Sequence, residues 1–224
     1  PGPPGVLDDY ACLIAGLLDL YEATGTPRWL AEARRLERMV AARFDDPATG
    51  SFFLTANDAE RLPVRERPLE DGAEPSGNSI MAMNLLRLAE FTSDDVYRTR
   101  AARVVTAASG LLVRAPLAAS ELLVALDFQL DTPRAIVIAV SPDDAGAGPF
   151  LDRLRARFLP NRVLLTVRAS DLPALIPLTP LAADKPLLQG RTTAYVCERH
   201  VCALPTTDPD QFATQITAVQ PLRP

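Results

Sequence analysis

Two short acidic motifs hold the side chains of this chain that are best suited to chemistry. The first is LDDYA at residues 7–11, where Asp8, Asp9 and Tyr10 open an apolar run. Acids are common at helix N-termini, because a carboxylate caps backbone N–H groups and complements the helix dipole. One acid suffices for capping, so we expect the second carboxylate to face a cavity, with capping by both as the simpler alternative.

The second motif, EDGAEPSGNS at residues 70–79, is richer in polar groups. Pro75 disfavours helical geometry at Glu74, so Ser76 is the expected N-cap of the helix that follows. Gly77 lets another backbone or a ligand approach closely. The side chains available for binding belong to the acids and to the first helical turn: Asp71, Glu74, Ser76, Asn78 and Ser79.

The two motifs would share one cavity mouth if the helices that they open run parallel. Carboxylates, an amide, hydroxyls and an aromatic ring suit the binding of sugar hydroxyls, and a carboxylate pair also suits acid–base work. The catalytic candidates are therefore Asp8, Asp9 and Glu74, and the ligand-binding candidates are Tyr10, Asp71, Ser76, Asn78 and Ser79. The alternative is a polar network that caps helices and anchors a loop. No cofactor is expected in either case.

The elements that must position these motifs alternate in character along residues 1–131. Apolar helices are predicted at residues 7–23, 79–91 and 116–128, and amphipathic helices at residues 27–44 and 94–112. An apolar helix is buried on several sides, whereas an amphipathic helix covers it from outside. This inner–outer alternation predicts a repeating αα-hairpin, as in helical toroids and solenoids, and a mainly α fold. Two short strands, 52–55 and 62–65, are expected in the long intervening loop.

Residues 132–224 have a different pattern and predict a small α/β region. The apolar runs 135–140 and 162–167 flank a short amphipathic helix at residues 150–158, which indicates a βαβ unit. A proline-rich surface loop is expected at residues 173–186. A hairpin should follow, and then a terminal helix that begins at Pro209 after Asp208 as its N-cap.

The hairpin contains Cys197, His200 and Cys202. A structural zinc ion takes four ligands, and no convincing fourth lies nearby, so we expect no metal. The two cysteines should instead face each other across the hairpin, where a reversible disulfide is possible. The sequence GAG at residues 146–148 departs from a dinucleotide-binding fingerprint at its third glycine position and carries Asp143 and Asp144, which would repel a pyrophosphate.

Composition limits the partners further. The net charge of −5 argues against nucleic acid as a main partner. No apolar run approaches the roughly 20 residues of a membrane span. Three cysteines are too few for a disulfide scaffold, so we expect a reducing, cytoplasmic setting. The opening PGPPG favours a linker or a fragment of a longer chain.

Five segments resemble one family in order: LDDYACLIAGLLDLYEATG, GSFFLT, DGAEPSGNS, ALDF and AYVCERHVCALP. They are similar to the thioredoxin-domain-containing spermatogenesis-associated protein 20 family, including its bacterial YyaL-type members. The resemblance implies the C-terminal part of a protein with an N-terminal thioredoxin-like domain. It also implies about half of an (α/α)6 toroid, similar to N-acylglucosamine 2-epimerases and six-hairpin glycosidases.

Two functions follow from this resemblance. One is the binding or processing of a carbohydrate-like small molecule in an acid-lined cavity. The epimerase-like relatives rely on cavity histidines, however, and the single histidine here, His200, lies outside the predicted helices. The other is a redox or protein-interaction module that works with the missing thioredoxin-like domain and uses Cys197 and Cys202.

Overall fold

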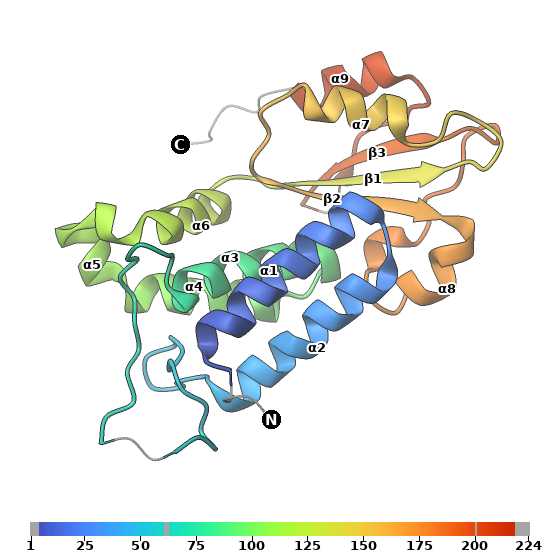
Figure 1. Ribbon diagram of the computed structural model, residues 1–224. Coiled ribbons are helices and arrows are strands. Elements are labelled where there is room, and N and C mark those ends of the chain that lie inside the picture. The colour runs from blue at the N-terminus through green and yellow to red at the C-terminus, as the bar shows by residue number, and fades with distance from the viewer. Residues whose placement is uncertain (1–4, 61–62, 200, 218–224) are drawn as a thin grey trace. The chain divides into compact units, whose positions relative to one another are not determined.

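The computed structural model describes residues 5–60, 63–199 and 201–217 (Figure 1). The chain divides into two compact units, Pro1–Asp131 and Thr132–Pro224. About half of the chain is helical and one sheet has four strands, so the fold as a whole is mixed α/β. Within the described ranges the helices are too short or too polar to cross a membrane.

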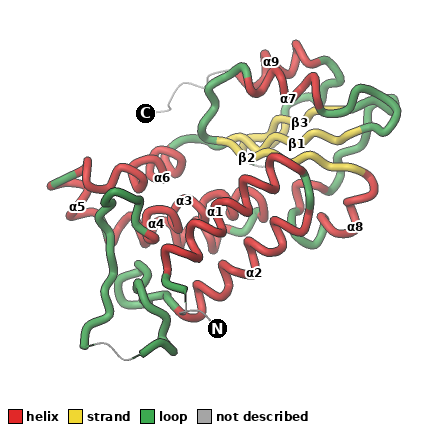
Figure 2. The backbone as a smooth tube through the Cα atoms, in the orientation of Figure 1, coloured by secondary structure: helices red, strands yellow, loops and turns green. Residues whose placement is uncertain are grey.

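The first unit consists of helices and loops (Figure 2). The α-helices in it pack in two rows, with α3 at the centre in contact with α1, α4 and α6, while α2 covers α1. The bounds are α1 (Leu7–Thr24), α2 (Pro27–Arg43), α3 (Gly77–Thr92), α4 (Asp95–Ala107), α5 (Ser109–Arg114), η1 (Pro116–Ala119) and α6 (Ser120–Leu130).

The packing of these helices follows their apolar patterns. Helix α3 is buried nearly all round, because α1, α4 and α6 enclose it. Helix α2 buries a single stripe at helical spacing, and Leu30, Ala33 and Val40 are fully buried within it. The burial of α3 and the single buried stripe of α2 are therefore as the sequence predicts. Helix α1 is buried on one side only, because Leu13 and Leu20, expected inside, are exposed. One acid of this amphipathic helix does not face solvent: Glu37 of α2 is buried against Arg100 of α4.

Three boundaries in this unit differ from the sequence-based expectation. The helix predicted at residues 94–112 is broken at Ala108 into α4 and α5, and the segment 116–119 is a 3-10 turn before α6. The strand expected at residues 52–55 is absent. Phe52 forms only an isolated bridge with Asp45, because its other backbone groups bond to a side chain of α3. The second expected strand, 62–65, lies partly outside the described residues.

The second unit is built on the sheet β2-β1-β3-β4. Strands β1 (Arg134–Val140) and β2 (Arg162–Arg168) are parallel and are joined through α7 (Gly148–Arg155), which confirms the predicted βαβ unit. Strands β3 (Thr193–Glu198) and β4 (Val201–Cys202) form the predicted hairpin, and β3 pairs antiparallel with β1.

Helices α7 and α9 (Pro209–Thr217) share a core with one face of this sheet. Phe150 of α7 and Phe212 of α9 pack edge to face, with ring centroids 5.6 Å apart, over Ile136 and Val196 of the strands. The segment expected as a surface loop, 173–186, is partly buried instead. It contributes α8 (Leu172–Leu175), after the short turn η2 (Ala169–Asp171), and η3 (Pro180–Ala182), and η3 contacts β1.

Candidate functional site

The N-termini of α1, α3 and α6 meet at one end of the helical unit. Asp8 of α1 accepts a hydrogen bond from the backbone N–H of Gly77, the first residue of α3, at 2.9 Å. Asp71 accepts from the N–H of Ser76 at 2.9 Å and from the N–H of Glu121 at 2.8 Å, so it joins the starts of α3 and α6. Helices α1 and α3 therefore run parallel, and the LDDYA and DGAEPSGNS motifs lie together.

Gly77 is required by this close approach. A Cβ atom at residue 77 would lie 2.3 Å from Asp8 Oδ1 and 2.8 Å from Leu7 Cγ, both below the distance that real Cβ atoms reach. The absence of a side chain is what lets the first turn of α1 dock on the first turn of α3. The glycine serves helix–helix contact at this position, and the contact brings the acids of both motifs into one cluster.

The polar residues of the α3 first turn are buried and anchor the long loop. Asn78 accepts from the N–H of Phe52 at 2.7 Å and donates to the carbonyls of Phe52 and Pro68 at 3.0 and 2.8 Å. Ser76 caps the helix as expected, because its Oγ accepts from the N–H of Ser79. Asn78 and Ser79 are 1% and 0% exposed. Asn78 therefore holds the loop, Ser79 pairs with Ser76 at 2.9 Å, and neither side chain faces solvent as a ligand-binding role would need.

The two acids of LDDYA have separate structural partners. Asp9 accepts from the N–H of Val6 at 2.9 Å and so caps its own helix. This leaves Asp8 as the second carboxylate, and one of its oxygens caps α3 through Gly77. Sequence reasoning did not assign this role, because the two residues are 69 positions apart. Tyr10 packs its ring on Phe44, with centroids 5.3 Å apart.

The electrostatics show that the acids form one cluster. Burial raises the pKa of Asp8, and the neighbouring charges of Asp9 and Glu74 raise it further against the lowering effect of the Gly77 hydrogen bond. Burial and the charge of Asp71 likewise raise the pKa of Glu121. A carboxyl group with a raised pKa holds its proton at a higher pH than usual.

Two members of the cluster were not singled out from the sequence. Glu121 stands in the first turn of α6, the third inner helix, and its place after Ser120 was the available signal. Cys12 is exposed one turn along α1, and burial together with the charges of Asp8 and Glu74 raises the pKa of its thiol. Asp9 and Glu74 are exposed, whereas Asp8 and Glu121 are half-buried. This end of the unit therefore presents several carboxyl groups in different environments.

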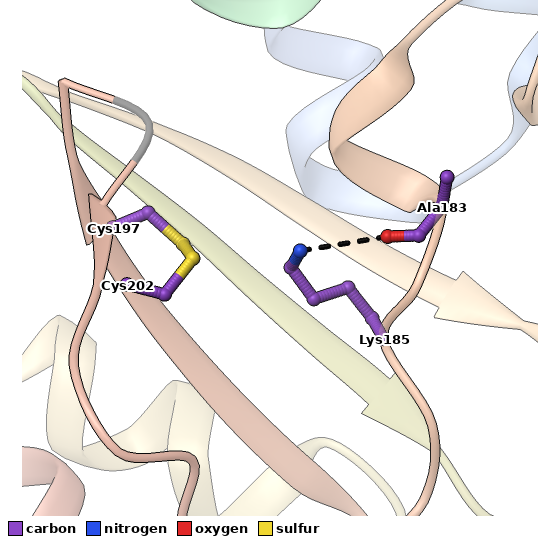
Figure 3. Close-up of a disulfide and its surroundings, with 4 residues drawn as sticks. All are labelled: Ala183, Lys185, Cys197 and Cys202. Atoms are coloured by element: carbon purple, nitrogen blue, oxygen red, sulfur yellow. Dashed lines mark hydrogen bonds between the residues drawn. A yellow bond between two sulfur atoms is a disulfide. The ribbon is translucent and has the colours of Figure 1, made fainter.

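The second candidate cluster lies on the β3–β4 hairpin. Cys197 and Cys202 pair across the two strands and form a disulfide with an S–S distance of 2.01 Å (Figure 3). This confirms the expectation that the two cysteines face each other. His200 lies outside the described residues. Within the described ranges no group of three or more His, Cys, Asp or Glu side chains is arranged to hold a metal ion.

The fold and the two clusters define a class of chain: a two-row helical unit with an acidic end, followed by a small α/β unit with a disulfide hairpin. No known protein-family profile matches the sequence. The chain is 36% identical over 210 residues to spermatogenesis-associated protein 20 of mouse and to that of human. It is 31% identical over 199 residues to the uncharacterized protein B0495.5 of Caenorhabditis elegans.

These alignments cover most of the chain. The mouse and human matches take in 92% of it, and the C. elegans match takes in 88%. The chain belongs to the spermatogenesis-associated protein 20 family, as its motifs predict. It spans only 27% of the length of the mouse and human relatives.

Proposed function

We propose that this chain forms part of an (α/α) toroid and that the toroid binds a carbohydrate-like small molecule at the end where the inner helices begin. The observation that carries the proposal is the meeting of three helix N-termini through Asp8 and Asp71. It gathers Asp9, Glu74 and Glu121 on one end of the helical row. Carboxylates accept hydrogen bonds from hydroxyl groups, and a cluster that contains acids with a raised pKa suits acid–base work on a sugar.

The edges of the helical row support the toroid. Helix α1, at one edge, exposes Leu13 and Leu20 on a single stripe that also contains Gly16, where a Cβ atom would meet open space. Helix α6, at the other edge, exposes Val124 and Leu130. The stripe on α1 is a surface that a further inner helix would cover, the exposed apolar side chains of α6 are available to another, and the relatives have ample additional length to supply both.

The acids at this end differ in their contacts, and this difference suits ligand binding and proton transfer. Asp8 and Asp71 are held by backbone N–H groups and give the end its shape. The raised pKa of Glu121 suits it to donate a proton, and Glu74 is exposed and accessible to a ligand.

A ligand screen on the full-length protein tests this proposal. Thermal-shift measurements with neutral monosaccharides, N-acetylated amino sugars and their phosphate esters should show a concentration-dependent rise in Tm for one of these classes. The variant Glu74→Gln should remove the rise and leave the Tm without ligand nearly unchanged, because Glu74 is exposed. A panel with no shift, or a shift that survives Glu74→Gln, would contradict the proposed site.

A second function is favoured by a separate observation, the disulfide of the β3–β4 hairpin. In this proposal the α/β unit is a redox module, and its partner is a thioredoxin-like domain elsewhere in the full-length protein. A dithiol of that domain would exchange with Cys197 and Cys202. The test is to reduce the thioredoxin-like domain in the full-length protein and to measure whether the Cys197–Cys202 disulfide opens at a rate that depends on that domain's cysteines.

A further inference from the structure

The two sulfurs of the hairpin disulfide differ in their surroundings. Cys197 lies on β3 and is 1% exposed, while Cys202 lies on β4 at the end of the sheet and is exposed. A thiolate that attacks a disulfide needs access to one sulfur and displaces the other as the leaving group. Access from solvent therefore favours attack at Cys202, with Cys197 as the leaving thiolate.

This disulfide contributes little to holding the unit together. The cysteines are only five positions apart, and a cross-link stabilises less when the loop that it closes is short. Backbone hydrogen bonds also hold the same segment: Ala203 N–H to the Val196 carbonyl at 2.9 Å, and a reciprocal pair between Ala194 and Thr206 at 2.8 and 3.1 Å. The fold of the unit should therefore survive reduction.

The positively charged Lys185 lies on the same face of the sheet as Cys197, the residue that would leave as a thiolate. Lys185, the single lysine of the sequence, places its Nζ 5.5 Å from the ring centroid of Tyr195. Tyr195 and Cys197 are two positions apart on β3 and so point to the same face. In Figure 3 the Lys185 side chain extends toward the disulfide. Its amino group donates a long hydrogen bond of 3.4 Å to the Ala183 carbonyl.

The charge of this lysine is not neutralised by a nearby acid. In the described part of the chain Lys185 forms no salt bridge, and its hydrogen bond goes to a neutral carbonyl. The acid next to Cys197 on the strand, Glu198, is paired with Arg134 at 2.9 Å. An unpaired ammonium beside a thiol lowers the pKa of that thiol and stabilises its thiolate.

We propose that Cys197–Cys202 is a redox-active disulfide opened by a dithiol at Cys202, and that Lys185 is the positioning residue that stabilises the departing Cys197 thiolate. This inference rests on the second proposed function and adds the direction of attack and the role of Lys185. It is independent of the carbohydrate site, which belongs to the helical unit.

The exchange balances in two steps. A thiolate of the dithiol attacks Cys202 Sγ, so an intermolecular S–S bond forms, the Cys197–Cys202 bond breaks, and Cys197 leaves as a thiolate. The second thiol of the dithiol, as its thiolate, then attacks its own partner sulfur and releases Cys202 as a thiolate. The dithiol is oxidised to a disulfide by two electrons, and the protein disulfide is reduced by the same two.

The first test measures the reduction rate with dithiothreitol on the 224-residue chain carrying Cys12→Ser, which removes the exposed free thiol. Lys185→Gln should slow the opening of the disulfide roughly threefold to tenfold, because the leaving-group pKa rises. Lys185→Arg should restore the rate by restoring the charge. Arg155→Gln removes an exposed cation of α7 and is the matched control, with no expected change.

Two further readouts separate this role from a merely structural one. In the reduced protein the ultraviolet absorbance of the thiolate should fall in Lys185→Gln and return in Lys185→Arg. With glutathione as a monothiol, the mixed disulfide identified by mass spectrometry should lie on Cys202.

The outcomes distinguish the parts of the proposal. Equal rates in Lys185→Gln and in the parent, or a mixed disulfide on Cys197, would overturn the assigned roles while the redox function stood. A disulfide that dithiothreitol opens only when urea unfolds the chain would overturn the redox function itself.

Discussion

The contact between α1 and α3 requires a residue without a side chain at position 77, and Gly77→Ala tests this requirement. The added Cβ would lie 2.3 Å from Asp8 Oδ1, so the start of α1 must move away from α3. This movement breaks the charge-assisted hydrogen bond from the Gly77 N–H, which contributes about 1.5–3 kcal/mol. Overpacking against Leu7 costs about 1–3 kcal/mol more. The better helix propensity of alanine offsets less than about 1 kcal/mol.

The net expectation is a loss of about 1.5–6 kcal/mol in the free energy of unfolding of the helical unit. Urea denaturation followed by tryptophan fluorescence measures it directly, because the single tryptophan, Trp29, lies on α2 of that unit. The matched control is Gly16→Ala in α1, where a Cβ atom meets nothing within 4 Å. That change should stabilise the unit by about 0.5–1 kcal/mol, since alanine is the better helix former. A Gly77→Ala protein as stable as the parent would refute the close docking of the two helices.

Three other changes have defined outcomes. Asn78→Ala leaves the backbone groups of Phe52 without their partner, so it should cost about 3 kcal/mol and speed limited proteolysis of the 45–76 loop. The pKa of Asp8 is raised above 3.8 in the folded chain, so the folded state binds more protons than the unfolded state. The free energy of unfolding should therefore fall as pH rises through that raised pKa. Asp8→Asn should remove this fall, which is measured as the urea midpoint at a series of pH values. Arg100→Met removes the cationic partner of the buried Glu37 and should cost about 3 kcal/mol, part of which Glu37→Gln in the same chain should recover in urea melts.

Local patterns were enough to predict most of the elements. Each of several segments has a pattern of apolar residues that is typical of one type of secondary structure. These segments are the apolar runs of α1 and α3, the amphipathic stripe of α2 and the two parallel strands. The hairpin cysteines could be paired from the sequence because only a short turn separates them. In each of these cases the residues that decide the structure are close together along the chain.

The roles that sequence reasoning missed depend on contacts between distant residues. The sequence shows two acids at the start of α1, but the partner of Asp8, Gly77, comes into reach only when α1 and α3 pack. Residues 52–55 resemble a short strand, but both backbone groups of Phe52 bond to the Asn78 side chain. Glu37 looks like a solvated acid until α4 brings Arg100 beside it.

The measurement that most directly tests the proposed carbohydrate site is calorimetric titration of the full-length protein with the sugar class that raises its Tm. We expect Asp9→Asn and Glu74→Gln each to weaken binding at least about tenfold, which corresponds to about 1.4 kcal/mol of binding free energy. The control is Asp95→Asn, an exposed acid in the first turn of the outer helix α4, which runs antiparallel to α3 and begins at the opposite end. Asp95→Asn should leave the affinity unchanged. Equal losses in all three variants, or no loss in Asp9→Asn and Glu74→Gln, would contradict a ligand site at the end where the inner helices begin.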